Sequence, residues 1–315
     1  MIAIIRLVTT QAGWSYNMMR RIERAYEELK PENVILYPNH PLDLGVHDFN
    51  PSQVSNVYKN NIDLTEIKHV KKIIFLEPLQ DPYLRMIEAG LNTPFDVHIH
   101  SNPLYAVYDM KRKWAYVHEV SFPSMITQRQ NTVDNIKNYS AYFAVSAVGG
   151  FLEKFNPIAF RRNNYILWAG YNVGNIRKGY QEFITLAINN PRYTFVACTD
   201  VAIPHEIKPN NVVNYVGLSA REFLEITKSC SYVLVTSKVD NFPYALYDAI
   251  SVGLIPLVPD TVWFTDFPKK FRYTDNISLD IKVEEYELNE IVKDHFYLDT
   301  FKRIVQSRTL EKNRV

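Results

Sequence analysis

The sequence predicts an α/β protein built from two doubly wound domains, and two features lead to this prediction. Apolar runs of strand length alternate with segments of helical periodicity in both halves of the chain, as in proteins with helices on both faces of a parallel sheet. At 315 residues, the chain is also long enough for two domains of about 150 residues each. We expect the two domains to face each other across a cleft.

In the first half, runs with the composition of strands lie at residues 2–8, 33–37, 72–76, 95–100 and 115–119. Helical spacing is found at 16–29 and 82–89. Gly13 lies in the loop before the first helix, where a tight turn alone would explain a glycine.

Residues 156–163 separate two periodic regions and carry Pro157, Arg161 and Arg162. We therefore place the domain boundary here, with one domain at 1–158 and the other at 159–315. In the second half, strands are expected at 164–170, 193–198, 211–217, 232–235 and 254–258. Helices are expected at 179–188, 223–229, 244–252, 284–293 and 298–305.

Two helix ends in the second half carry clear signals. Ser219 and Glu222 have the spacing of a capping box, in which each residue satisfies a backbone N–H of the other. Gly253 follows the last apolar position of the helix at 244–252 and is expected at its C-cap. By contrast, residues 263–275 show no regular pattern.

The composition excludes several classes of protein. Hydrophobic residues make up 47% and charged residues 22%, and the net charge is +1, without the basic excess usual in nucleic-acid-binding proteins. No apolar run approaches the roughly 20 residues of a membrane span, and the apolar start is too short for a signal peptide. We expect a cytoplasmic protein, free or peripheral at the inner face of a membrane. Cys198 and Cys230 lack metal-ligand spacing and are expected to be reduced core thiols.

The stretch from 232 to 258 reads as strand, loop, helix and strand, and two carboxylates mark it. Asp240 lies in the loop and Asp248 about two helical turns further on, so one extended ligand at the strand ends could meet both. A carboxylate suits the vicinal hydroxyls of a sugar, because it accepts two charge-assisted hydrogen bonds. Alternatively, Asp240 caps the helix and Asp248 is a solvated helix position.

This stretch resembles the donor-binding segment of GT-B glycosyltransferases of the family-4 type. That segment has an acidic residue before Gly-Phe-Gly or Gly-Phe-Pro, then a second acidic residue before Ala-Met-Ala-x-Gly-x-Pro-Val-Val. Here the first part reads Asp240-Asn241-Phe242-Pro243, and the second reads Asp248-Ala249-Ile250-Ser251-Val252-Gly253-Leu254-Ile255-Pro256-Leu257-Val258. Both acids are Asp where the family usually has Glu, and Asn241 replaces the preferred Gly.

Three further segments are similar to the same family. Residues 139–155 resemble its strand and following helix, and Ser146 would cap or begin that helix, which is a sufficient structural reason for a serine there. Lys178-Gly179 matches the element whose cations hold the donor diphosphate, although Tyr171 occupies the usual Arg position and Arg177 would have to supply that charge. His118, at a strand end, matches the family's His that faces the donor sugar; His98 and His100 match less well. The structural alternatives are an exposed Arg-Lys pair that starts a helix and a histidine that merely packs.

The resemblance implies a fold of two Rossmann-like domains, an acceptor-side domain at 1–158 and a donor-binding domain at 159–315. The donor would be a UDP- or GDP-sugar, with no metal or other cofactor and with retention of anomeric configuration. The implied catalytic residues are His118, Arg177, Lys178 and Asp240. The implied donor-binding residues are Gly13, Gly170, Gly217, Leu218, Asn241, Phe242, Pro243, Tyr244 and Asp248.

We therefore expect a glycosyltransferase that moves a hexosyl or pentosyl group to an acceptor hydroxyl, with a glycan or envelope saccharide as acceptor. Basic clusters at Lys111-Arg112-Lys113 and at Arg20, Arg21 and Arg24 leave open a viral (phage) enzyme that glycosylates a hydroxylated base in duplex DNA, in the host cytoplasm. The arginine cluster could equally be a solvated helix face. The departures from the family pattern also leave open a non-catalytic nucleotide-sugar-binding module.

Overall fold

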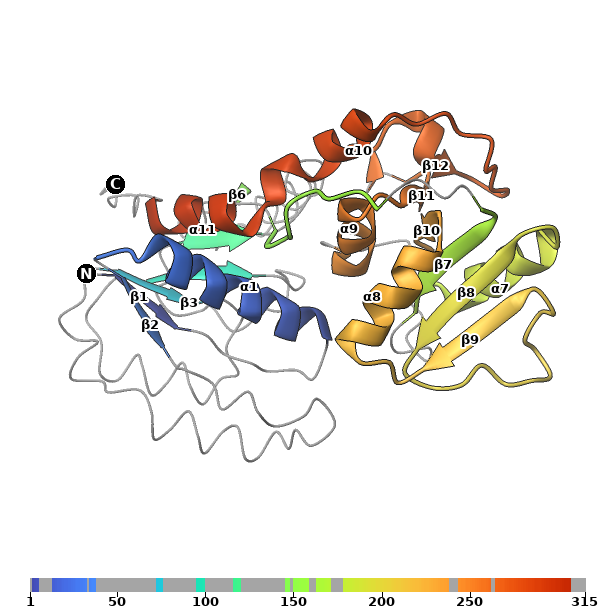
Figure 1. Cartoon of the computed structure of the whole chain (residues 1–315), viewed down its shortest axis with the longest axis horizontal. Coiled ribbons are helices and arrows are strands. Elements are labelled where there is room, and N and C mark those ends of the chain that lie inside the picture. The colour runs from blue at the N-terminus through green and yellow to red at the C-terminus, as the bar shows by residue number, and fades with distance from the viewer. Residues whose placement is uncertain are drawn as a thin grey trace, which may run out of the picture. The chain divides into compact units, whose positions relative to one another are not determined.

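The computed structural model describes residues 2–5, 13–32, 34–37, 72–75, 95–99, 116–119, 145–147, 150–158, 163–170, 178–237, 243–261 and 264–306 (Figure 1). The chain divides into two compact units, and each contains a six-stranded sheet. The first unit comprises Met1–Phe151 and Tyr297–Val315, and the second comprises Leu152–Phe296.

The sheet of the first unit is parallel, with the strand order β2-β1-β3-β4-β5-β6. Its strands are β1 (Ile2–Ile5), β2 (Val34–Tyr37), β3 (Lys72–Phe75), β4 (Phe95–Ile99), β5 (Tyr116–Glu119) and β6 (Val145–Ala147). The chain runs outward from β1 in one direction to β2 and in the other through β3 to β6. This reversal is the doubly wound topology that the sequence predicts.

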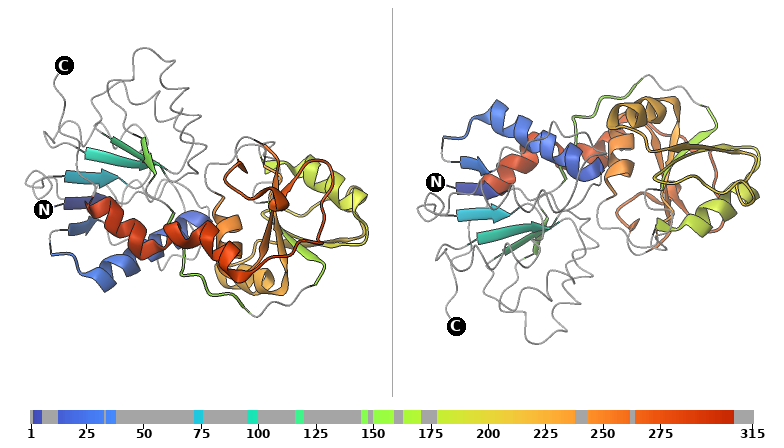
Figure 2. Two further views of the ribbon diagram at one scale, coloured as in Figure 1. Left: turned by 90° about the horizontal axis from the view of Figure 1, so that it is seen from above. Right: turned by 90° about the horizontal axis from the view of Figure 1, so that it is seen from below.

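Helices α1 (Gly13–Leu29) and α11 (Tyr297–Gln306) pack side by side in the first unit (Figures 1 and 2). The Arg24 Nη2 donates to the Tyr297 hydroxyl at 2.8 Å, and the Arg24 guanidinium lies 4.7 Å from the centre of the Tyr297 ring. The Tyr297 hydroxyl in turn donates to Glu28 at 2.6 Å. Arg21 is buried and donates to the Phe151 carbonyl oxygen at 2.9 Å. Arg21 is therefore neither on a solvated face nor at an acceptor surface, because it ties α1 to the chain at Phe151.

The last helix belongs to the first unit, whereas the sequence-based boundary assigned all of 159–315 to the second domain. Tyr297 bonds to α1 as described, and the Thr300 hydroxyl donates to the Gly150 carbonyl oxygen at 2.5 Å. These contacts return the chain after Phe296 to the first unit. The periodicity at 298–305 predicted this helix but held no information about the unit on which it packs.

Three local predictions differ from the structure around these segments. Gly13 is the first residue of α1 rather than part of a loop, and Ser146 lies inside strand β6 rather than at the start of a helix. No helix is formed by residues 151–158, because their backbone N–H groups bond to distant carbonyls. Leu152 donates to His295 at 2.8 Å, and Asn156 donates to Ser251 at 2.9 Å.

The second sheet is also parallel and has the order β12-β11-β10-β7-β8-β9. Its strands are β7 (Tyr165–Ala169), β8 (Thr194–Thr199), β9 (Val212–Val216), β10 (Tyr232–Leu234), β11 (Ile255–Pro259) and β12 (Arg272–Tyr273). The chain goes from β7 outward to β9, then returns to β10 on the other side of β7 and continues to β12. Strands β7 and β10 are thus neighbours at the point where the winding reverses.

Helices cover both faces of the second sheet (Figure 2). Helix α7 (Tyr180–Asn189) lies on one face, and α8 (Ala220–Ser229) and α9 (Tyr244–Ser251) lie on the other. Right-handed crossovers account for this, because the β7-to-β8 connection runs across the sheet in one direction and the β9-to-β10 and β10-to-β11 connections run in the other. Helix α9 ends as predicted: Gly253 has φ +101°, Gly253 donates to Ile250, and Leu254 donates to Ala249, which is a Schellman motif.

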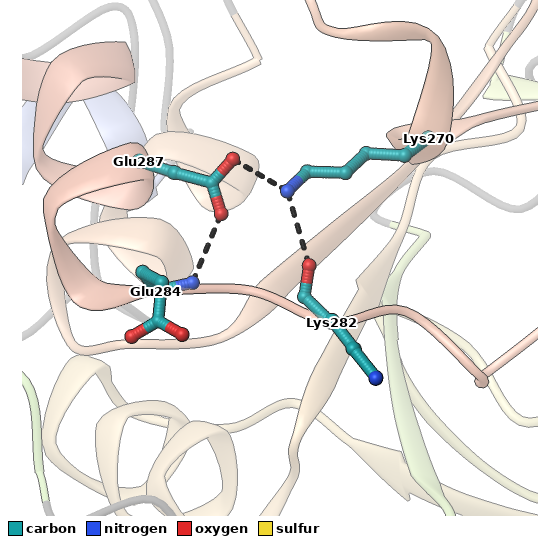
Figure 3. A network of polar contacts seen from close by, with 4 residues as sticks. All are labelled: Lys270, Lys282, Glu284 and Glu287. Carbon is teal, nitrogen blue, oxygen red and sulfur yellow. Dashed lines mark hydrogen bonds and ion pairs between the residues drawn. The ribbon is translucent and has the colours of Figure 1, made fainter.

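A polar network joins the segment before β12 to the start of α10. The one-turn helix η4 (Lys269–Phe271) precedes β12, and Lys270 Nζ donates to Glu287 at 2.5 Å and to the Lys282 carbonyl oxygen at 3.0 Å (Figure 3). Glu287 also accepts from the Glu284 N–H at 2.9 Å at the start of α10 (Glu285–Val292). The hydrogen bond from Lys270 lowers the pKa of the Glu287 carboxyl. Residues 263–275, expected to be irregular, thus contain η4 and β12.

Both cysteines are buried free thiols, as predicted. Burial raises the pKa of Cys198 to about 12 and that of Cys230 to about 11, so both thiols stay protonated at neutral pH.

Candidate functional site

The candidate site lies where the second sheet reverses its winding, at the carboxyl ends of β7 and β10. Ligands of open α/β sheets bind in the crevice outside such strand ends. The described residues there are Gly170 directly after β7, Thr236 shortly after β10, and Lys178 and Gly179 at the start of α7.

Helix α7 begins without a side-chain cap. Its N-cap is Gly179, in the left-handed conformation with φ 68° and ψ 42°, so the N-cap residue has no side chain that could accept from the first-turn N–H groups. Those N–H groups and the positive end of the helix dipole can therefore take an anion. Lys178 is half-buried directly before the cap and adds a cation there.

A glycine is required at the N-cap of α7 for two reasons. The left-handed conformation disfavours any residue with a Cβ. A Cβ built on Gly179 would also lie 2.2 Å from the carbonyl oxygen of Thr236. The start of α7 is therefore in direct backbone contact with the end of β10.

The Thr236 hydroxyl joins three segments at this point. It accepts from Trp168 Nε1 at 2.9 Å and donates to the Lys178 carbonyl oxygen at 2.8 Å. Trp168 lies in β7 and Lys178 precedes α7, so one hydroxyl links the ends of both central strands to the start of the helix. The end of β10 is also held from its other side, where the Tyr273 hydroxyl donates to the Val235 carbonyl oxygen at 2.7 Å.

Gly170 and Gly217 also end strands at this edge of the sheet. Gly170 donates to the Cys198 carbonyl oxygen at 3.0 Å, and a Cβ there would lie 1.9 Å from the Trp168 ring. Gly217 follows β9, has φ +65° and donates to the Thr199 carbonyl oxygen at 3.0 Å. A Cβ on Gly217 would meet no atom within 4 Å, so the space beside this glycine is open. Leu218 next to it is half-buried.

Helix α9 carries the described part of the predicted donor-binding motif. Pro243 is its N-cap, Tyr244 is buried and Asp248 is half-buried. Tyr244 and Asp248 are four residues apart, so their side chains lie on one face of the helix. The structure thus places Asp248 in the second turn of α9.

The remaining predicted site residues are in the first unit or outside the described residues. His118 lies in β5, paired in register with His98 of β4 and with Ser146 of β6. Gly13 begins α1. Further residues that the sequence analysis names in its site arguments lie outside the described residues: His100, Lys111, Arg112, Lys113, Tyr171, Arg177, Asp240, Asn241 and Phe242.

Sequence reasoning missed Trp168, Thr236 and Tyr273. Trp168 and Thr236 are each 2% exposed, and burial, with the nearby Glu182 carboxylate, raises the pKa of the Tyr273 hydroxyl. One signal could have indicated Trp168, because the N–H of a tryptophan in a buried strand needs an acceptor. Thr236 would then have been a candidate, since it is a hydroxyl residue directly after the neighbouring apolar strand.

Among the described residues, no group of three or more His, Cys, Asp or Glu side chains is arranged as it would be around a metal ion. No described helix is both long and apolar enough to cross a membrane.

The chain was compared with known proteins and structures. No protein-family model matches the sequence, and no curated protein matches it. The structure is similar to that of a lipopolysaccharide outer core galactosyltransferase, WaaB, with a TM-score of 0.63 and 14% identity over 96% of this chain and 98% of that one. It is similar to AviGT4, a glycosyltransferase involved in avilamycin A biosynthesis, with a TM-score of 0.60 and 12% identity over 97% and 96%.

A third similar structure is Anabaena HepE in complex with UDP-glucose, with a TM-score of 0.56 and 14% identity over 99% of this chain and 96% of that one. Identities this low establish the fold alone. Together with the two parallel sheets, these similarities show that the chain has the GT-B fold, as predicted.

Proposed function

We propose that this protein is a glycosyltransferase of the family-4 type, which transfers a sugar from a nucleoside-diphosphate sugar to an acceptor hydroxyl. The observation that carries this proposal is the start of α7, where a helix without a side-chain cap and Lys178 meet at the reversal point of the second sheet. This is a site for a phosphate-bearing ligand within a GT-B fold. HepE, which shares the fold, is described as a complex with UDP-glucose.

The diphosphate of the donor would lie at the start of α7. The first-turn N–H groups, Lys178 and, from the preceding loop, Arg177 would stabilise the charge that grows on the leaving diphosphate. Such fixed donors and cations supply this stabilisation without a metal ion, so we propose a metal-independent reaction. Retention of configuration follows from the resemblance to the family.

The rest of the donor would extend along the carboxyl edge of the second sheet. Asp248 on α9 would accept hydrogen bonds from the ribose hydroxyls, and the backbone at Gly217 and Leu218 would contact the base. Asp240 and Asn241, with Phe242, Pro243 and Tyr244, would surround the transferred hexosyl or pentosyl group. From the first unit, we assign His118 to the donor sugar and Gly13 to the donor or acceptor.

For the acceptor we propose a glycan or an envelope saccharide, bound by the first unit in the cytoplasm. WaaB, described as acting on the lipopolysaccharide outer core, has the same fold. A role in DNA modification has less support once the contacts of the arginine cluster are considered than it has from the sequence alone. Two arginines of the basic cluster, Arg21 and Arg24, bond to Phe151 and Tyr297 inside the first unit.

A panel of nucleoside diphosphates in a thermal-denaturation assay tests the proposal. A ligand present at 100 times its Kd stabilises the native state by about 2.7 kcal/mol, so the true donor nucleotide should raise Tm clearly. UDP and GDP are tested first, followed by UDP-sugars and GDP-sugars. Catalysis is then measured as the release of free sugar from the nucleotide-sugar that stabilises the protein. We expect one nucleotide to stabilise the protein and one of its sugars to be hydrolysed.

The outcomes separate the alternatives. Stabilisation without any hydrolysis or transfer would indicate a non-catalytic nucleotide-sugar-binding module. If no nucleotide changes Tm, the protein is not a nucleotide-sugar-dependent transferase.

A further inference from the structure

We infer that Thr236 is a positioning residue for the donor diphosphate: its hydroxyl fixes the peptide between Lys178 and Gly179, through which the chain enters α7. This inference rests on the proposed function, because it assumes that the diphosphate binds at the start of that helix. Thr236 would act through Lys178 and α7 and would not itself touch the donor.

The hydroxyl of Thr236 both donates and accepts a hydrogen bond within the protein. It donates its one proton to Lys178 and accepts from Trp168, and the side chain is 2% exposed. Both bonds are buried or partly buried, where a hydrogen bond that is left half-made costs more than one in water. The Thr236 side chain therefore has one strongly preferred conformation, in which its hydroxyl donates to the Lys178 carbonyl oxygen.

Trp168 is itself fixed by the first turn of α7. Its ring stacks on Phe183 at a centroid distance of 4.1 Å and an interplanar angle of 8°, and Phe183 donates its N–H to the Gly179 carbonyl oxygen at 2.9 Å. The contacts therefore form a closed circuit from Trp168 through Thr236 to Lys178, into α7, and back to Trp168. A change at Thr236 would loosen the start of the helix as a unit.

The close contact of Gly179 with the Thr236 carbonyl oxygen adds a steric limit to this circuit. The chain cannot move toward β10, and the hydroxyl of Thr236 keeps it from moving away. A trans peptide is planar, so fixing the Lys178 carbonyl also fixes the direction in which the backbone continues. The N–H groups of the first turn are thereby oriented together, as electrostatic stabilisation of a leaving group requires.

Thr236→Val tests the inference, because valine keeps the shape of threonine and removes both hydrogen bonds. Thr227→Val is the matched control: Thr227 is equally buried at 2% exposure, lies in the same unit, and donates through its hydroxyl to the Phe223 carbonyl oxygen of its own helix. The probes are UDP and uridine, or GDP and guanosine if GDP is the nucleotide that stabilises the protein. Affinities are measured by titration calorimetry.

We expect Thr236→Val to weaken nucleoside-diphosphate binding about tenfold and to leave nucleoside binding within about twofold, because only the diphosphate contacts depend on the start of α7. Thr236→Ser should restore the diphosphate affinity, and Thr227→Val should change neither affinity. A purely structural role would lower Tm in both valine variants and leave the ratio of the two affinities unchanged.

Two results would overturn the inference in distinguishable ways. If Thr236→Val keeps the wild-type ratio of diphosphate to nucleoside affinity, Thr236 does not position the site, although the proposed function stands. If the wild-type protein binds neither nucleoside diphosphate more tightly than its nucleoside, the diphosphate site fails and the inference with it. Should Thr236→Val not fold, Trp168→Phe takes its place, because it removes the N–H donor and keeps an aromatic ring. The same ratio of diphosphate to nucleoside affinity is then measured, and an unchanged ratio overturns the inference.

Discussion

Helices α7 and α8 of the second unit have the same length of ten residues, and each follows a strand of the same sheet, yet they begin in opposite ways. At α8, the Ser219 hydroxyl accepts from the Glu222 N–H, and the Glu222 carboxylate accepts from the Ser219 N–H at 2.9 Å. At α7, the N-cap is a left-handed glycine without a side-chain cap bond from the described residues, and a lysine precedes it.

The difference lies in how each helix start is held. At α8, the side chains of the capping box satisfy the backbone N–H groups of Ser219 and Glu222. At α7, the N-cap glycine has no side chain, and the Thr236 hydroxyl instead donates to the carbonyl oxygen of the preceding Lys178. Both helices carry a glutamate in the first turn, Glu182 in α7 and Glu222 in α8, so the contrast concerns the cap and not the local charge.

The largest expected effect is on catalysis by Lys178→Ala. Removing one preorganised contact to a developing charge typically lowers turnover by about 10²- to 10³-fold, and we expect a loss of this size in donor hydrolysis or transfer. Arg177→Ala should act in the same direction if Arg177 supplies the second cation. Because half-buried or surface truncations of this kind cost only about 0.5 kcal/mol of stability, Tm should hardly change.

Lys269→Ala is the control for Lys178→Ala. Lys269 is exposed and lies in η4, which precedes β12 and is not adjacent in the chain to α7. Its replacement should leave turnover at the wild-type level. Equal turnover in Lys178→Ala and Lys269→Ala would remove Lys178 from the diphosphate site.

Gly179→Ala should be the most destabilising of the simple substitutions. The left-handed conformation costs a residue with a Cβ about 1–2 kcal/mol, and the contact with Thr236 forces a further shift. Gly217→Ala separates the two causes, since Gly217 has nearly the same φ, 65° against 68°, and open space around it. In denaturant unfolding of the ligand-free protein, we expect a clearly larger loss for Gly179→Ala. Equal losses would mean that the close contact is relieved without cost.

A smaller effect is expected for Asp248→Asn, through the ribose end of the nucleotide. Losing a charge-assisted hydrogen bond should weaken nucleoside binding about tenfold, and the diphosphate contacts at α7 should be unaffected. Titration with the nucleoside alone measures this, with the exposed Asp280→Asn as the control. Unchanged nucleoside affinity in folded Asp248→Asn would make the residue purely structural.

The smallest effect is expected for Ser219→Ala at the start of α8. Loss of the N-cap should cost about 1 kcal/mol in the free energy of unfolding, because a first-turn N–H loses its acceptor. Affinity for the nucleoside diphosphate should not change, since α8 does not take part in phosphate binding. A large loss of diphosphate affinity in this variant would show that α8, and not only α7, contributes to the site.

The comparison of the two helices also shows what the sequence could and could not predict. The α8 cap was predicted correctly because both of its residues are local and three positions apart. The second-unit strands and helices appear close to their predicted bounds, because apolar periodicity and glycine signals are local as well. Gly253, for example, ends α9 as expected.

Features that depend on distant contacts were not predicted. The Thr236 hydroxyl joins residues 68 and 58 positions away, and no local pattern carries that information. The same reason explains why α11 was assigned to the second domain and not to the first, since Thr300 bonds to Gly150 across 150 positions. Arg21 was misinterpreted as part of a surface cluster because its partner, Phe151, is 130 positions away.

The central claim is that the start of α7 binds the donor diphosphate. Backbone amide NMR, comparing the protein saturated with the stabilising nucleoside diphosphate and with its nucleoside, tests this most directly. We predict that the amide resonances of Tyr180, Gln181 and Glu182 differ between the two states, and that those of Arg221, Glu222 and Phe223 do not. Unchanged α7 resonances, or changes confined to the start of α8, would contradict the account.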